Sequence, residues 1–119
     1  MDIKIGEYAR LNSTLYNTVV ILKIMEVFDN TIVTENNGSI FQGEYGKDEI
    51  INHSYNIIDL IEENDFINSM RIAEIKSNKN GVLKCMVDSD YEFITTILND
   101  EIKSVVTKEQ FSFMQYEVN

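Results

Sequence analysis

The sequence contains no proline and no tryptophan, and it has a single cysteine, Cys85, and a single histidine, His53. One cysteine excludes an internal disulfide, which suits a protein of the reducing cytoplasm. One cysteine and one histidine are also too few ligands for a zinc site. The chain has no glycine-rich phosphate-binding loop either. We therefore expect no disulfide, no metal and no cofactor.

Long apolar runs are missing as well. None approaches the roughly 20 residues that a membrane-spanning helix needs. The N-terminal residues MDIKIGEY show no basic segment followed by an apolar one, so we expect no signal peptide. The sequence thus predicts a cytoplasmic protein that does not bind membranes.

Basic residues are scarce. The chain has 10 lysines and arginines against 20 acids, which gives a formal net charge of −10. A chain of this charge repels phosphates, so direct nucleic-acid binding is not expected. If charge guides binding, the partner is a basic protein, such as one that binds nucleic acid, or a cation. The alternative is that the acidity serves solubility alone.

Short β-rich runs separated by turn residues dominate what is present. The run TVVILKIMEV is the strongest strand signal because β-branched residues recur throughout it. Strands are predicted for residues 7–11, 18–27, 31–34, 39–42, 65–68, 70–76, 82–87, 91–98 and 102–106. The segment Asn36–Gly38 predicts a hairpin turn before strand 39–42, and the GEYG segment at 43–46 is predicted to be a loop.

Two helical segments are expected. Residues 56–61 place apolar side chains as one helical turn packed on a core would. Thr107 and Gln110 have the spacing of a capping box, which predicts a C-terminal helix over residues 107–114 with Phe111 and Met114 facing the core.

A weak internal repeat relates residues 5–9 (IGEYA) to residues 63–67 (ENDFI). Each places Gly or Asn, residues that accept positive φ, before an acid, an aromatic and an apolar residue. We predict a mainly β (α+β) protein with two SH3-like β-barrel halves in tandem. The first half covers residues 1–52, a connector with a helical turn covers 53–64, and the second half covers 65–119.

The candidate catalytic residues are few. His53, Ser54 and Asp59 are the residue types of a hydrolase triad, but adjacency does not supply its geometry and no G-x-S-x-G segment exists. The acids from Asp88 to Glu92 begin like a calcium loop, yet the required Gly and final Glu are absent. Cys85 lies inside a strand pattern and is expected in the core. We therefore predict that the protein is not an enzyme.

The acids are more informative as a surface. A segment without Lys or Arg holds Asp88, Asp90, Glu92, Asp100 and Glu101, which we take as the candidate partner-binding residues. A second group comprises Asp59, Glu62, Glu63 and Asp65. Two acidic patches on a β scaffold would imitate a row of phosphates and occupy the basic groove of a nucleic-acid-binding protein. The simpler alternative is a solvated acidic face.

Three segments resemble a family of small proteins encoded by phages and prophages of low-GC Gram-positive bacteria. They are KIGEYAR at 4–10, HSYNIIDLIEEND at 53–65 and IKSVVTKEQFSFMQYEV at 102–118. The sequence departs from the family pattern at Glu63-Asn64, where the pattern has Val-Gly. The resemblance implies a phage accessory gene product and carries no catalytic residue.

These observations lead to one expected function and two alternatives. We expect an inhibitor that binds a nucleic-acid-binding defence protein of the host, such as a Cas effector, in the manner of an anti-CRISPR. The first alternative is a small-ligand sponge for a nucleotide signal, with Arg10, Arg71 or Lys84 lining a pocket. The second is a structural or assembly module of the phage. A homodimer is left open by the sequence.

Overall fold

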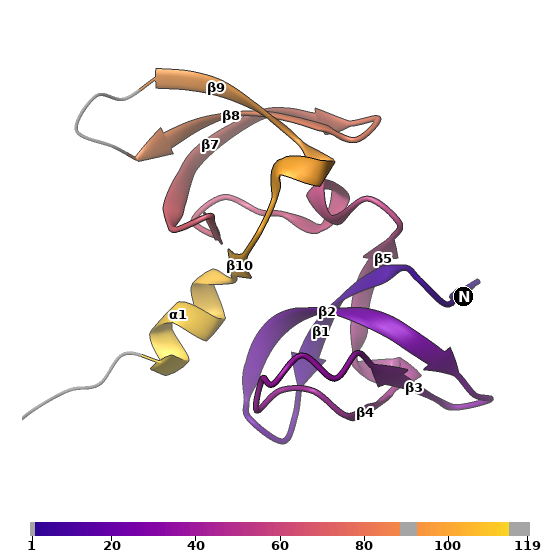
Figure 1. Ribbon diagram of the computed structural model, residues 1–119. Helices are drawn as coiled ribbons and strands as arrows, with labels where there is room; N and C mark the ends of the chain where they lie inside the picture. Colours follow the sequence, from indigo (N-terminus) through magenta and orange to yellow (C-terminus); the bar gives the residue numbers. More distant parts are fainter. Residues whose placement is uncertain (1, 89–92, 115–119) are drawn as a thin grey trace, which may run out of the picture.

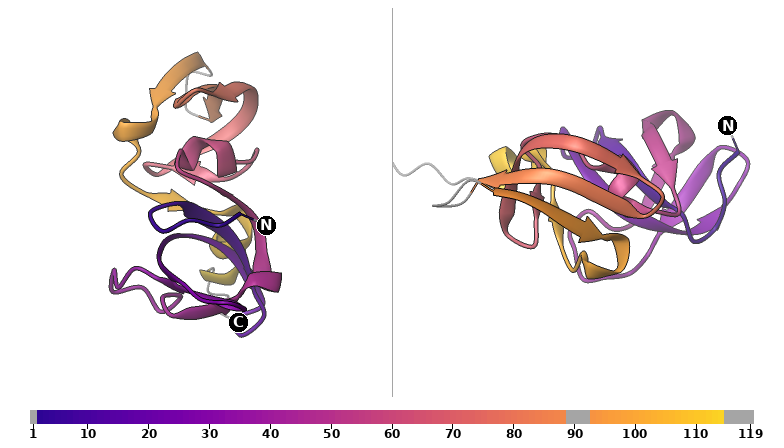
Figure 2. Two further views of the ribbon diagram at one scale, coloured as in Figure 1. Left: turned by 90° about the vertical axis from the view of Figure 1, so that its right-hand side faces the viewer. Right: turned by 90° about the horizontal axis from the view of Figure 1, so that it is seen from above.

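The computed structural model describes residues 2–88 and 93–114, and it is mainly β. Two five-stranded antiparallel sheets form separate lobes, which Figures 1 and 2 show one above the other. The first sheet contains β1 (Tyr8–Ser13), β2 (Thr18–Val27), β3 (Thr31–Thr34), β4 (Glu44–Gly46) and β5 (Ile50–Ser54). The second contains β6 (Phe66–Ile67), β7 (Met70–Lys79), β8 (Val82–Asp88), β9 (Phe93–Leu98) and β10 (Val105–Val106).

The two sheets have the same strand connectivity. The first has the order β4-β3-β2-β1-β5 and the second β10-β6-β7-β8-β9, so that in each the last strand pairs with the first. A single 3-10 turn precedes that last strand in both, η1 (Lys47–Glu49) before β5 and η3 (Asn99–Glu101) before β10. Each turn is capped in the same way, because Gly46 N–H donates to Glu49 and Leu98 N–H donates to Glu101.

The predicted repeat is visible in the backbone. Gly6 has φ of 94° and Asn64 has φ of 75°, so both positions adopt the positive φ that the sequence predicts. The amide of Gly6 donates to Ile24 O at 2.9 Å, and that of Asn64 donates to Ile72 O at 2.7 Å. Each therefore turns the chain into the first strand of its sheet in the same way.

Each sheet encloses its own hydrophobic core. In the first, Leu11, Ile24 and Ile32 are fully buried. In the second, Ile72 and Leu83 are fully buried. Strand alternation determines which side chains enter each core, since every second side chain of an antiparallel strand faces the same side of its sheet.

The segment between the sheets contains η2 (Ile57–Leu60), a 3-10 turn where a helical turn is predicted. Ile58 of this turn is fully buried in the second core, while β1 and β5 of the first sheet also contact the turn. The C-terminal helix α1 (Lys108–Met114) returns to the first sheet and packs on β2, as Figure 1 shows. The chain thus crosses between the lobes twice.

Of the two hydrogen bonds that the predicted capping box of α1 would contain, the one that Thr107 accepts is confirmed. Gln110 N–H donates to Thr107 Oγ at 2.9 Å. The Thr107 hydroxyl itself donates to the carbonyl of Val19 in β2, which attaches the helix start to the first sheet. Phe111 is 42% exposed and stacks on Phe66 with ring centroids 4.5 Å apart, so it covers the core edge rather than facing inward. The Met114 side chain lies outside the described residues.

The predicted strand at 39–42 is wrong. These residues form a loop, and the returning strand is β4, in the segment where a loop is predicted. Side chains hold the loop through local hydrogen bonds, such as Gly38 N–H to Gln42 Oε1 and Phe41 N–H to Ser39 Oγ. Phe41 is buried although it is not in a strand, and its carbonyl accepts the Tyr45 hydroxyl at 2.5 Å.

Other strand boundaries also differ from prediction, such as the end of β1, which lies at Ser13 rather than at residue 11. Strand β7 continues to Lys79, through most of the segment predicted as a turn, and β10 comprises only the last two of the predicted residues 102–106. Residues 89–92, which include part of a predicted turn and the start of a predicted strand, lie outside the described residues.

Candidate protein-binding surface

The residues that resemble a hydrolase triad do not form one. His53 Nδ1 lies 2.7 Å from Oε2 of Glu7, the residue that precedes β1. The Ser54 hydroxyl donates to Asp59 Oδ2 at 2.5 Å and accepts the amide of Asn56 at 3.0 Å. The serine and histidine thus have separate partners, and the serine lacks a neighbouring base in the triad arrangement. The histidine contact joins β5 to the residue before β1, and the serine contact joins the end of β5 to the η2 turn.

The centre of the connector is a charge cluster at the junction of the two sheets, which we call the seam cluster. Arg10 of β1 donates to Asp65 at 2.7 and 3.3 Å, and to the carbonyl of Leu60 at 2.9 Å. The Arg10 and Asp65 side chains are only 2% and 0% exposed. Glu62 and Glu109 approach Arg10 from the partly exposed side at 3.4 and 3.3 Å. Four charged residues therefore meet here, from β1, from the loop between η2 and β6, and from α1.

The environment of Arg10 keeps it charged. Burial alone would lower the pKa of Arg10, but the hydrogen bond and charge of Asp65, together with Glu62 and Glu109, raise it. Asp65 also accepts the backbone amides of Glu62 and Lys108, at 2.8 and 3.0 Å. The seam cluster is thus a satisfied structural network, because its buried carboxylate has a donor on every side.

This network changes the interpretation of the second acidic group. Asp65 is buried, so its prediction as a surface acid is wrong. Glu62 contacts both Arg10 and Lys108, and the hydrogen bond with Glu62 raises the pKa of Lys108. Asp59 accepts the Ser54 hydroxyl. Glu63 is the exposed member of the group for which the structure gives no side-chain partner.

The candidate partner-binding acids flank strand β9. Asp88 is exposed at the end of β8, where Arg71 donates to it at 2.8 and 2.9 Å. Asp100 and Glu101 are exposed in η3, directly after β9. Asp90 and Glu92 lie outside the described residues. A six-residue strand measures roughly 17 Å, so Asp88 and the η3 acids lie near opposite ends of β9.

Between these acids lies a surface with little charge, the outer face of β8 and β9. Ile94, Thr96 and Leu98 of β9 are exposed, and they stand opposite Met86, Lys84 and Val82 of β8. Ile94 and Leu98 are 54% and 46% exposed. This surface has acids at both ends, and Lys84 is the one charged residue among these six. Such a surface is suited to a protein partner, since charges are usually depleted at the core of an interface.

Cys85 is buried in the second core, as predicted, and burial raises the pKa of its thiol. A thiol that is enclosed in a core and whose pKa is raised is a weak nucleophile. Over residues 2–88 and 93–114, the structure contains no group of histidine, cysteine and acidic side chains able to hold a metal ion.

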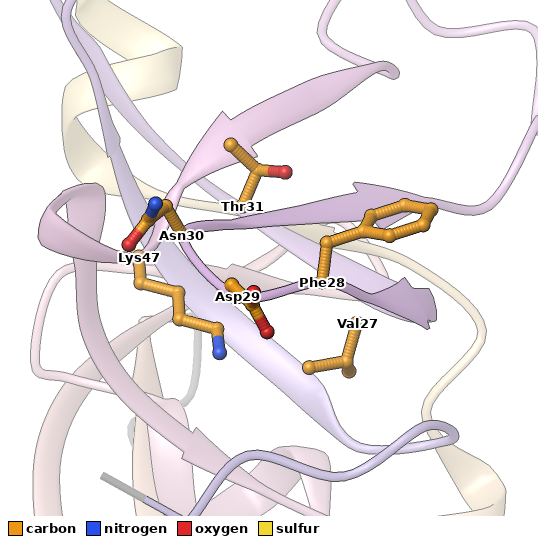
Figure 3. Close-up of a pocket in the computed structure, with 6 residues that line it drawn as sticks. All are labelled: Val27, Phe28, Asp29, Asn30, Thr31 and Lys47. Atoms are coloured by element: carbon orange, nitrogen blue, oxygen red, sulfur yellow. The ribbon is translucent and has the colours of Figure 1, made fainter.

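Two of the hollows in the molecular surface could bear on ligand binding. The first is a shallow depression at the β2–β3 turn, where Figure 3 shows Asp29 beside Lys47 from η1, while the ring of Phe28 points away from Lys47. The second, which we call the inter-sheet groove, has a volume of about 340 Å³. Its lining includes Tyr8 and Lys23 from the first sheet, and Ile102 and Lys103 from the segment before β10.

The basic residues that the sequence suggests for a ligand pocket do not converge. Arg10 is held in the seam cluster, and Arg71 binds Asp88 and Asn64. Lys84 is exposed on the outer face of β8. The structure instead brings Lys23 and Lys103 to one groove. The sequence gives no sign of this, because the two lysines are 80 positions apart.

Within the part of the chain that the structure describes, no helix combines the length and apolar character needed to cross a bilayer. Comparisons of the chain with protein-family models, with curated proteins and with solved structures gave no match.

Proposed function

We propose that the protein is a phage-encoded inhibitor that acts by binding directly to a nucleic-acid-binding defence protein of the host, as an anti-CRISPR does. It functions in the host cytoplasm, and two SH3-like halves provide a rigid scaffold rather than an active site. The contact surface is the outer face of β8 and β9 with its flanking acids, Asp88, Asp90, Glu92, Asp100 and Glu101.

The observation that carries this proposal is the position of the exposed acids beside a largely uncharged face. Asp88 lies at one end of β9, and Asp100 and Glu101 lie at the other. The net charge of −10 steers the whole molecule toward a basic partner and raises the association rate. Such a partner is a protein whose nucleic-acid groove is lined by Lys and Arg.

The test neutralises the five acids together, as Asp88→Asn, Asp90→Asn, Glu92→Gln, Asp100→Asn and Glu101→Gln. Glutamine keeps an oxygen that accepts the Leu98 amide, so η3 retains its cap. We expect the tagged variant to lose capture of basic defence proteins from a lysate of cells carrying them. Wild-type capture should weaken as salt is raised, because the attraction is screened.

A matched control removes the same charge elsewhere. Exposed acids distant in sequence from β9 are available at Glu26, Asp29, Glu44, Asp48 and Glu63. Neutralising these should leave capture nearly intact although the net charge changes equally. If the two folded variants capture equally well, specific recognition through the β9 acids is rejected.

A second candidate function, binding of a small anionic signal such as a cyclic nucleotide, is favoured by the inter-sheet groove. Lys23 lies with its ammonium 6.0 Å from the centroid of the Tyr8 ring, and Lys103 lines the same groove. The lining also includes Glu35, and the Lys103 ammonium donates to the carbonyl of Asp100 at 3.2 Å. Two ammonium groups beside aromatic and aliphatic side chains suit a phosphate joined to a flat ring.

This candidate predicts stabilisation by ligand. A cyclic nucleotide present at about 100 times its Kd should raise the unfolding temperature by several degrees. Replacing Lys23 and Lys103 by glutamine should abolish the shift, whereas replacing the exposed Lys76 and Lys79 should preserve it. A nucleotide panel that shifts neither the wild type nor the control would rule this function out for the nucleotides tried.

A further inference from the structure

Strand β9 is an open edge of the second sheet. It pairs with β8 on one side and is last in the strand order. Among residues 2–88 and 93–114, no strand pairs with its other side. In Figure 1, β9 lies at the top of the molecule, on the side away from the first sheet.

The alternation of an antiparallel ladder shows which backbone groups face outward. Asn99 N–H donates to Gly81 O at 2.9 Å, on the β8 side. Residues two and four positions earlier then face β8 as well, and the N–H and C=O groups of Ile94 and Thr96 point away from it. Leu98 N–H also points away, and Glu101 Oε1 accepts it at 2.7 Å. The free donors and acceptors are therefore concentrated at Ile94 and Thr96.

This edge lacks the usual protection against pairing. Natural edge strands carry charged residues, proline or a bulge, which prevent another chain from adding a strand. The β9 sequence FITTIL contains no charge and no proline, and its pairing with β8 shows no register shift. The exposed side chains of Ile94 and Leu98 add an apolar contact beside the free backbone groups.

We propose that the partner docks by adding an extended segment to the β9 edge, a segment that is β-branched or apolar at its centre and carries Lys or Arg at both ends. The inference rests on the proposed function, from which it takes the basic character of the partner. What it adds is the way in which the partner makes contact. Backbone hydrogen bonds supply part of the affinity, as in other strand-addition complexes. Asp100 and Glu101 at one end, and Oδ1 of Asp88 at the other, receive the basic residues, since both Arg71 contacts to Asp88 fall on its Oδ2 atom.

A second copy of the chain fits this edge less well. Antiparallel pairing of two β9 strands would bring the Asp88 end of one copy to the Asp100 and Glu101 end of the other. Both molecules also carry a net charge of −10. Juxtaposed like charges oppose association, whereas a basic segment meets attraction at both ends.

The probe is a fluorescent peptide of sequence Lys-Lys-Thr-Val-Thr-Val-Thr-Lys-Lys, titrated with the full-length protein and followed by anisotropy. Thr96→Pro removes an outward N–H without removing a bond to β8, and proline is tolerated at such edge positions. Thr96→Val keeps the N–H and serves as the matched control. We expect Thr96→Pro to weaken peptide binding about tenfold or more and Thr96→Val to leave it nearly unchanged.

The peptide itself provides a second control, since methylating its central backbone nitrogens blocks strand addition without altering its charge. Equal binding of the methylated and unmethylated peptides, or of Thr96→Pro and the wild type, would overturn the inference. So would sedimentation of the wild type as a dimer that Thr96→Pro dissociates. If Thr96→Pro loses the peptide but still captures the lysate protein, the proposed function survives without this docking mode.

Discussion

Replacing Asp65 by alanine is expected to lower the free energy of unfolding by about 3–5 kcal/mol, because the change leaves the Arg10 charge buried without its partner. The two side chains are nearly inaccessible, and two hydrogen bonds of 2.7 and 3.3 Å join them. Alanine also removes the acceptor for the amides of Glu62 and Lys108. Since small domains are stable by about 5–15 kcal/mol, urea denaturation followed by circular dichroism will resolve the loss.

The exposed members of the seam cluster provide the control. Glu109→Gln removes a charge that contacts Arg10 from a partly exposed position, and we expect it to cost less than about 1 kcal/mol. The double variant Arg10→Met with Asp65→Leu should be more stable than Asp65→Ala, because it leaves neither charge unpaired. A loss for Asp65→Ala no larger than that for Glu109→Gln would show that the buried pair does not hold the sheets together.

Local patterns predicted two strands closely. The bounds of β2 and β3 agree with prediction to the residue, and β-branched residues recur through both strands. The repeat around Gly6 and Asn64 was also visible, since positive φ restricts which residues fit. These features depend on neighbours in the sequence, so the sequence is sufficient to predict them.

The segment 39–42 was mispredicted because only one of its two apolar side chains is buried. Ile40 is exposed, whereas Phe41 is buried and packs edge-on against Tyr16 at 5.2 Å. A strand and a loop that inserts one aromatic into the core look alike over four residues. Only the hydrogen bonds of the folded loop distinguish them.

Long-range pairing could not be predicted. Arg10 and Asp65 are separated by 55 positions, and a charged residue is expected at the surface unless a partner is known. For the same reason, the sequence could not predict that Lys23 and Lys103 line one groove, the inter-sheet groove. The acids around β9 were found because they are close in sequence, but their division between the two ends of a strand required the fold.

Truncating Ile72 to alanine is expected to cost about 2–5 kcal/mol, since it leaves a cavity where a fully buried side chain packs in the second core. We further expect the Ile72→Ala substitution to lower the stability of both sheets, and not of the second sheet alone. The seam cluster and the contact of α1 with β2 join the two lobes, so that neither core should open alone. A single cooperative unfolding transition follows from this coupling.

Amide hydrogen exchange measured with increasing urea tests directly whether both sheets lose stability together. Protection of amides in β1 and β2 should fall together with that in β7 and β8 when Ile72 is truncated. Ile24→Ala is the matched change in the first core, since Ile24 is equally buried and its amide donates to Glu7 as that of Ile72 donates to Asp65. Ile51→Ala, at an exposed position, should change stability by no more than about 0.5 kcal/mol. Undiminished protection of β1 and β2 in Ile72→Ala would mean that the lobes unfold independently, and that the Arg10–Asp65 pair joins them without coupling their stability.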